Sequence, residues 1–190
     1  MTILIAAAAY LAGSVNFAII LLSLLGKEDP RTKFSGNAGT TNVYRQAGMF
    51  WAAVVLILDV GRALAIGASA LYLLDIPLVP WIGLALILGN RYPCFHGFRG
   101  GKGVASYIGF GAALSTVSAV LSCMVWVILF AITRIPFIAS FFMIITIAAG
   151  TIITYSHAPV AVSGVLGTVL LIFYNHKGNI EALREKKTAR

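Results

Sequence analysis

Long apolar segments separated by short polar loops make up most of the chain. A helix that crosses a bilayer needs about 20 apolar residues, within a range of about 17–25. Apolar segments near that length predict five spans: Ile3–Leu25, Met49–Leu74, the shorter Ile76–Gly89, Pro136–Tyr155 and Pro159–Tyr174. The pattern predicts an all-α, polytopic bundle of transmembrane helices in which residues 1–190 form a single domain.

The stretch Val104–Thr133 is long for one span, and its middle contains several Gly, Ser and Thr residues. The positive-inside rule decides how often it crosses, because cytoplasmic loops collect Lys and Arg. One crossing would put Arg134 and the basic tail on opposite sides. Two crossings, with a turn near Ala112–Thr116, place all cations except Arg62 inside. We therefore predict seven spans, with the N-terminus outside, the C-terminus in the cytoplasm, and Val104–Leu114 a short helix of about 17 Å.

The composition confirms the membrane class and narrows the possible partners. Only 11% of the residues are charged, 59% are hydrophobic, and the mean hydropathy is +0.93. Soluble domains carry about 25% charged residues, so this chain cannot cover a water-facing surface. The net charge of +8 is explained by basic cytoplasmic loops. We expect the lipid bilayer as a partner and no nucleic acid.

Two polar loops interrupt the apolar pattern, and each combines glycines with basic residues. The first, Ser35–Asn42, reads SGNAGTTN and precedes the second span; the second, Phe98–Gly103, reads FRGGKG and precedes the fourth. In the predicted topology both lie on the cytoplasmic side, where helix N-termini offer unpaired N–H groups and a positive dipole end to anions. Ser140, His176 and Asn179 return to the same face. The sequence therefore predicts a phosphate site at the cytoplasmic boundary.

Each of these residues also has a simpler interpretation. Gly36 and Gly39 can serve only the turn, and the Asn and Thr residues beside them can be ordinary helix caps. Arg45 and Lys102 can be cytoplasmic anchors. His96 stays open between a loop residue and a ligand contact. The repetition of the pattern on one side of the membrane favours a shared phosphate site.

The remaining charged residues restrict the chemistry. Asp59 and Arg62 lie three residues apart on one helix, so we expect a structural ion pair inside the bundle. The six acids are too scattered for a magnesium-dependent phosphotransferase, and we predict neither a metal site nor a cofactor. The GGKG sequence is not a Walker A loop, because Gly103 follows Lys102.

Three motifs in order resemble the bacterial acyl-phosphate:glycerol-3-phosphate acyltransferase family, often called PlsY, over nearly the whole length. The residues that carry this resemblance are SGNAGTTNVYR at Ser35–Arg45, FRGGKGVA at Phe98–Ala105, HKGNI at His176–Ile180, and Asp59, Arg62, Pro93, Arg134 and Ser140. The chain departs from the family pattern at Asn90, where His is usual, at Asn175, where Arg is usual, and at Ala182, Lys186 and Thr188.

The resemblance implies that a fatty acyl group moves from acyl phosphate to the 1-hydroxyl of glycerol 3-phosphate. Lysophosphatidate and inorganic phosphate are the products, in the first step of bacterial phospholipid synthesis. The implied location is the bacterial cytoplasmic (inner) membrane, with the active site at the cytoplasmic face. Acyl phosphate is a mixed anhydride whose phosphate leaves without metal help, so the implied enzyme is metal-independent.

The resemblance also assigns roles to residues of the two loops and the tail. The donor phosphoryl group is expected at Ser35, Gly36, Asn37 and Gly39, with Thr41 and Asn42 supporting that loop. The acceptor is expected at Arg45, Lys102, Ser140, His176 and Asn179, while His96 is kept as a further substrate contact. The predicted catalytic residues are Ser35, Arg45, Lys102 and His176. The general base is either His176 or a substrate phosphate, and we prefer the phosphate.

Two other functions fit parts of the pattern. A small membrane anion transporter would show cations or broken helices at the midplane and inverted repeats, whereas only Arg62 lies deep and no repeat is found. A different lipid-phosphate enzyme would use the same anion sites. The sequence leaves the oligomeric state open, with a monomer as the simplest case.

Overall fold

The structure is a computed structural model that describes residues 1–155 and 158–188, and all regular elements in this part of the chain are helical. The α-helices are α1 (Thr2–Ser14), α2 (Phe17–Leu24), α3 (Thr40–Ala47), α4 (Met49–Leu73), α5 (Val79–Arg91), α6 (Val104–Leu114), α7 (Thr116–Thr133), α8 (Pro136–Thr154), α9 (Pro159–Asn175) and α10 (Lys177–Thr188). Two short 3₁₀ turns, η1 (Ile76–Leu78) and η2 (Cys94–His96), precede and follow α5. The predicted all-α fold is confirmed for the described residues.

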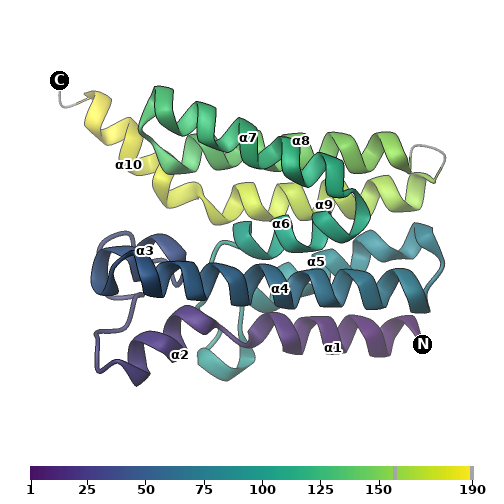
Figure 1. Ribbon diagram of the computed structural model, residues 1–190, viewed down its shortest axis with the longest axis horizontal. Coiled ribbons are helices and arrows are strands. Elements are labelled where there is room, and N and C mark those ends of the chain that lie inside the picture. Colours follow the sequence, from purple (N-terminus) through teal and green to yellow (C-terminus); the bar gives the residue numbers. More distant parts are fainter. Residues whose placement is uncertain (156–157, 189–190) are drawn as a thin grey trace.

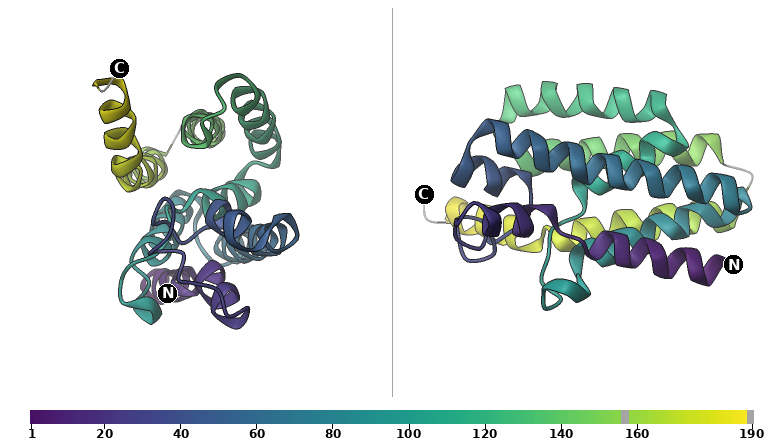
Figure 2. Two further views of the ribbon diagram at one scale, coloured as in Figure 1. Left: turned by 90° about the vertical axis from the view of Figure 1, so that its left-hand side faces the viewer. Right: turned by 60° about the horizontal axis from the view of Figure 1, so that its bottom comes forward.

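The long helices lie roughly parallel to one axis of the molecule, and the N-terminus and α10 lie at opposite ends of that axis (Figure 1). Within residues 1–155 and 158–188, four helical segments are long and apolar enough to cross a membrane: Thr2–Leu24, α4, α7 and α8. A fifth is formed if α9 and α10, bent by 42°, count as one span. Viewed along the helices, α7 and α8 stand beside the group formed by α1, α4, α5 and α6 (Figure 2). The protein is thus a multi-pass helical membrane protein.

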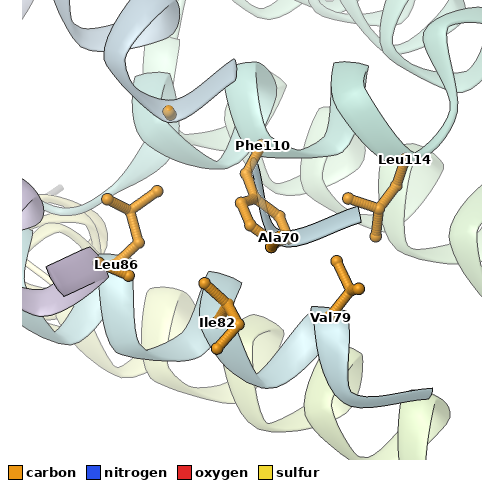
Figure 3. Close-up of a cluster of buried hydrophobic side chains, with 8 residues drawn as sticks. Ala70, Val79, Ile82, Leu86, Phe110 and Leu114 are labelled. Atoms are coloured by element: carbon orange, nitrogen blue, oxygen red, sulfur yellow. The ribbon is translucent and has the colours of Figure 1, made fainter. Parts of the chain in front are cut away.

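The largest buried cluster joins α1, α4, α5 and α6. Val79, Ile82 and Leu86 on α5 point toward Phe110 and Leu114 on α6 (Figure 3). Three alanines on α1 and α4 complete this cluster: Ala9, Ala63 and Ala70. Small residues allow helices to approach closely in lipid, where van der Waals packing rather than water exclusion holds them together. This packed group includes α5 and α6, the helices that precede and follow the second glycine-rich loop.

The predicted first span Ile3–Leu25 corresponds to the candidate span Thr2–Leu24, but its helix is broken into α1 and α2. The break lies at Val15 and Asn16. The Asn16 side chain accepts a hydrogen bond from the first turn of α2 at 3.1 Å and donates to the carbonyl of Ala38 at 3.2 Å. Arg62 donates to the carbonyl of Val15. Side-chain partners therefore satisfy backbone and side-chain groups that a break in a membrane helix would otherwise leave unpaired.

The sequence predicted that the first glycine-rich loop leads directly into the second span. This prediction is wrong, because α3 stands between the loop and α4. α3 carries the polar sequence TTNVYRQA and ends at Gly48, whose φ is +86°. α4 begins at the next residue. The glycine ends the short polar helix in a conformation that few other residues adopt, and the apolar sequence then starts a new helix.

Two other sequence predictions are confirmed. α6 covers the predicted Val104–Leu114, and α7 folds back from it after Ser115, as Figure 1 shows. Arg62 pairs with Asp59 at 3.1 Å between buried side chains, and the same guanidinium nitrogen donates to Ser106 on α6 at 3.0 Å. The ion pair therefore connects α4 with the first turn of the helix that follows the second glycine-rich loop.

Candidate functional site

The two glycine-rich loops touch each other at Gly101. A side-chain carbon on this glycine would lie 2.8 Å from the carbonyl oxygen of Ala38 and 2.8 Å from Oδ1 of Asn90. Any larger residue would therefore push the loops apart. The N–H of Gly101 donates to the carbonyl of Asn90 at 2.9 Å. Because Asn16 also holds the Ala38 carbonyl, both loops are fixed to the helices beneath them.

Asn42 organises the first loop from within. Its side chain is 1% exposed and donates to the carbonyls of Pro30 at 2.9 Å and Lys33 at 3.1 Å. Its Oδ1 accepts a hydrogen bond from the Ser35 hydroxyl at 3.2 Å. Gly36 adopts a φ of +65°, in the left-handed region that favours glycine. Ser35 and Gly36 therefore form an exposed turn over a rigid buried amide.

The remaining predicted residues of the first loop lie beside this turn. Asn37 and Gly39 are half-buried, and the backbone of Gly39 is extended, with a φ of −160°. The Gly39 carbonyl accepts hydrogen bonds from the backbone N–H groups of Asn42 and Val43 and so starts α3. Thr41 is exposed in the first turn of that helix.

A cation missed in the sequence joins the outer edges of the two loops. Arg31 chelates the Asp29 carboxylate, with nitrogen–oxygen distances of 2.6–3.0 Å. A further nitrogen of the guanidinium donates to the carbonyls of His96 at 2.5 Å and Arg99 at 3.2 Å. The Arg31 guanidinium holds the pKa of Asp29 below its usual value. The sequence feature that could have indicated the role of Arg31 is the Asp-Pro-Arg run just before the first loop.

Lys102 joins the second loop to the tail. Its ammonium donates to Oδ1 of Asn179, and its carbonyl accepts from Nδ2 of Asn175 at 3.3 Å. Burial, together with the nearby positive charge of Arg91, lowers the pKa of Lys102 to about 8. A partly buried cation beside a second cation is an electrostatic environment that favours a bound anion.

His176 is buried between α9 and α10, with 3% of its surface exposed. Its Nδ1 lies 2.8 Å from the carbonyl of Ile172. A carbonyl can only accept, so Nδ1 carries the proton and Nε2 keeps its lone pair. The Phe141 ring packs edge-on against the imidazole at 5.2 Å. Burial lowers the pKa of His176 to about 4, so the ring is neutral at pH 7.

Three predicted site residues make contacts elsewhere. Arg45 is exposed on α3, with its guanidinium 5.6 Å from the Phe34 ring centre. The Ser140 hydroxyl donates to the carbonyl of Pro136 at 2.9 Å and accepts from the Trp126 indole at 3.2 Å, so it links α7 to α8. His96 lies in η2 and lines a pocket of about 490 Å³ with Asp29, Arg31, Thr32, Phe95, Gly97 and Arg99. The structure thus groups Lys102, His176 and Asn179 closely, whereas Arg45, Ser140 and His96 lie outside that group.

The sequence of the chain matches one family over almost its full length. The family model described as glycerol-3-phosphate acyltransferase matches residues 3–186. The glycerol-3-phosphate acyltransferase of Azotobacter vinelandii is 38% identical over 184 residues, which cover 96% of each chain. The protein of the same description from Pseudomonas fluorescens is 37% identical over 181 residues, covering 95% of this chain and 94% of the relative.

Solved structures share the complete fold. A crystal structure of PlsY, an integral membrane glycerol 3-phosphate acyltransferase, in its glycerol 3-phosphate form gives a TM-score of 0.90 at 32% identity. The lysophosphatidic acid form gives a TM-score of 0.88 at 30% identity. Each match covers 97% of this chain and 92% of the solved chain. The similarity therefore includes both glycine-rich loops and the tail.

Proposed function

The chain belongs to the glycerol-3-phosphate acyltransferase family, and on this basis we propose that it moves a fatty acyl group from acyl phosphate to the 1-hydroxyl of glycerol 3-phosphate. The products are lysophosphatidate and inorganic phosphate. The observation that carries the proposal is the group formed by Lys102, Asn179 and His176 beside two touching glycine-rich loops. Two anionic substrates need two neighbouring phosphate sites, and the loops supply them.

The donor phosphoryl group binds at the first loop. Ser35 and Gly36 form its exposed turn, and Asn37 and Gly39 continue it toward the N-terminus of α3. Backbone N–H groups and a hydroxyl suit phosphate oxygens, and the N-terminus of a helix favours their charge. Thr41 and Asn42 support the loop. The rigidity that Asn42 gives this turn limits the reorganisation that binding requires.

The acceptor binds around Lys102, with Asn179 and His176 beside it. The Lys102 ammonium neutralises the phosphate of glycerol 3-phosphate, and the charge of Arg45 acts from the surface of α3. Ser140 and His96 are more distant supports of the same substrate. Positioning two reactants in this way can supply about 7–11 kcal/mol of the barrier reduction.

In the reaction, the 1-hydroxyl oxygen attacks the acyl carbon and forms the new ester bond. The bond between the acyl carbon and the phosphate oxygen breaks, and phosphate leaves with the electron pair. The hydroxyl proton passes to a phosphate oxygen or to Nε2 of His176. Because phosphate is a good leaving group from this anhydride, the reaction needs positioning and charge neutralisation rather than a metal.

The acyl chain of the donor needs an apolar path from the loops into the bilayer. An apolar groove of about 580 Å³ lies between α6 and α7, with Ile108, Ala112 and Ile128 in its lining. α6 begins two residues after Lys102, so the groove adjoins the proposed site. Replacing Ala112 with tryptophan would fill the groove and shift the preference toward shorter donors, measured with acyl phosphates of graded length.

The proposed topology has seven spans, with the N-terminus outside, the C-terminus inside and the site at the cytoplasmic face of the bacterial inner membrane. The opposite positions of the N-terminus and α10 support an odd number of crossings (Figure 1). A C-terminal green fluorescent protein fusion should fluoresce, whereas a C-terminal alkaline phosphatase fusion should be inactive. The reverse pattern would contradict this orientation.

The direct test combines purified protein, acyl phosphate, glycerol 3-phosphate and a chelator. We expect release of inorganic phosphate and formation of lysophosphatidate in equal amounts. Replacing Lys102 with methionine should remove most activity, while the matched variant Lys27→Met, which removes an exposed cation, should keep it. Folded protein that releases no phosphate above background would refute the proposal. Parallel reactions with acyl-CoA and acyl-carrier protein identify the donor.

A further inference from the structure

Asn175, the last residue of α9, carries a buried acceptor that no described residue satisfies. Its side chain is 7% exposed, and Nδ2 donates to the carbonyl of Lys102 at 3.3 Å. A carbonyl accepts only, so this contact fixes the amide with nitrogen toward the second loop. Oδ1 therefore points elsewhere, and within residues 1–155 and 158–188 it receives no hydrogen bond.

Buried acceptors without a donor are rare in proteins, and their position often has a functional reason. Asn175 precedes His176 and contacts the backbone of Lys102, whose ammonium binds Asn179. The amide that carries the unpaired oxygen is thus bound to the backbone of Lys102 and is next in sequence to His176. The phosphate group of a monoester dianion cannot satisfy this oxygen, because that group has no hydrogen to donate. A hydroxyl group can.

We propose that Oδ1 of Asn175 accepts a hydrogen bond from the 2-hydroxyl of glycerol 3-phosphate. The assignment rests on the proposed function and adds a residue that recognises the glycerol portion of the acceptor. The 1-hydroxyl must give up its proton during the reaction, which requires a base. An amide oxygen is not a base at neutral pH, so it suits the hydroxyl that keeps its proton.

A second unpaired group beside the same lysine agrees with this ligand. Nε of Arg91 is buried and has no acceptor among the described residues, and the charge of Arg91 acts on Lys102. One unpaired donor and one unpaired acceptor thus lie beside one cation. A molecule that carries both a phosphate monoester and a hydroxyl group satisfies both, because the phosphate oxygens accept from Nε of Arg91 and the hydroxyl donates to Oδ1 of Asn175.

The test compares two acceptors that differ in one group. 3-Hydroxypropyl phosphate keeps the phosphate and the reacting 1-hydroxyl of glycerol 3-phosphate and lacks the 2-hydroxyl. We expect the wild-type kcat/KM to be about 10- to 100-fold higher for glycerol 3-phosphate, because the analogue without the 2-hydroxyl leaves Oδ1 unpaired. Asn175→Leu removes the acceptor at similar volume and should reduce this preference to within about threefold.

The ratio of the kcat/KM values for the two acceptors distinguishes a role of Asn175 in recognising the 2-hydroxyl from a role in holding the loop. A variant that only disturbs the loop loses activity toward both acceptors and keeps the wild-type ratio. Thr168→Val, which removes another buried hydrogen bond from α9, is the matched control and should keep both the ratio and the activity.

Three results would count against the proposal. A wild-type ratio near one overturns it without any variant, and an unchanged ratio in Asn175→Leu overturns it as well. Absence of turnover of glycerol 3-phosphate by the wild-type protein overturns the proposed function first, and the role of Asn175 with it.

Discussion

Replacing Gly101 with alanine tests whether the contact between the two glycine-rich loops sets the geometry of the site. The added carbon would lie 2.8 Å from the Ala38 carbonyl oxygen and 2.8 Å from Oδ1 of Asn90. A comfortable carbon–oxygen contact is about 3.3 Å, so the loops must separate by roughly 0.5 Å. The Ala38 carbonyl cannot yield freely, because Asn16 holds it at 3.2 Å.

The expected loss follows from this displacement. A misplacement of about 1 Å in an active site can reduce the rate on the order of 100-fold, so roughly 0.5 Å predicts a loss of about tenfold in kcat/KM. Overpacking of this kind also costs about 1–3 kcal/mol of stability. The variant should therefore remain folded, with a lower unfolding temperature and a clear defect in turnover.

The assay is phosphate release from acyl phosphate by detergent-purified protein, with thermal unfolding measured on the same sample. Gly61→Ala is the matched control, because no heavy atom lies within 4 Å of the carbon it adds. The double variant Asn90→Ala/Gly101→Ala removes one of the two clashes and should recover part of the activity relative to Gly101→Ala alone. A folded Gly101→Ala protein with more than half of the wild-type kcat/KM would refute the argument.

Three further predictions follow from the charged groups. Arg31→Gln removes the guanidinium that pairs with Asp29 and holds the second loop, so kcat should fall about tenfold; an unchanged kcat in the phosphate assay would contradict this role. Arg62→Leu leaves the Asp59 carboxylate buried without its cation and should lower the free energy of unfolding, measured in detergent, by about 3–5 kcal/mol. Leucine at both positions should restore much of this loss. The ammonium of Lys102 is charged below its pKa of about 8 and neutral above it, so kcat/KM for glycerol 3-phosphate should fall about tenfold per pH unit above pH 8. Lys102→Arg should move this decline beyond pH 10. A pH profile of Lys102→Arg identical to that of the wild type would exclude Lys102 as the titrating group.

The membrane helices could be predicted because apolar length and cation placement are local properties of the sequence. For the short helix α6, length and the Gly, Ser and Thr residues in the stretch raised the question and charge decided it, since a reversal near Ala112–Thr116 puts Arg134 and the tail on one side. The break at Asn16 could not be found in this way. Its side chain is stabilised by the Ala38 carbonyl, 22 residues later, and the broken backbone by Arg62, 47 residues from Val15.

The motifs of the candidate site could be predicted, but their connections could not. Arg31 reaches carbonyls 65 and 68 residues away, and backbone acceptors leave no trace in the side-chain sequence. At Ser140 the sequence predicted a substrate contact and gave no sign of the partners that the structure shows. The Ser140 hydroxyl looked available in the first turns of a helix, yet the carbonyl four residues earlier and Trp126 use it. The departure from the family pattern at Asn175 was visible, but its unpaired oxygen was not.

The environment of His176 bears on which group takes the proton of the acceptor hydroxyl. Nδ1 is bound to the Ile172 carbonyl, so Nε2 is the only basic atom, and burial lowers the pKa of the ring to about 4. A phosphate group has its second pKa at about 6, which makes phosphate the stronger base by roughly two pKa units. The loops bring such a group next to the reacting hydroxyl in the proposed mechanism. The chemistry therefore favours proton transfer to phosphate, with His176 acting through the hydrogen bond that Nε2 can accept.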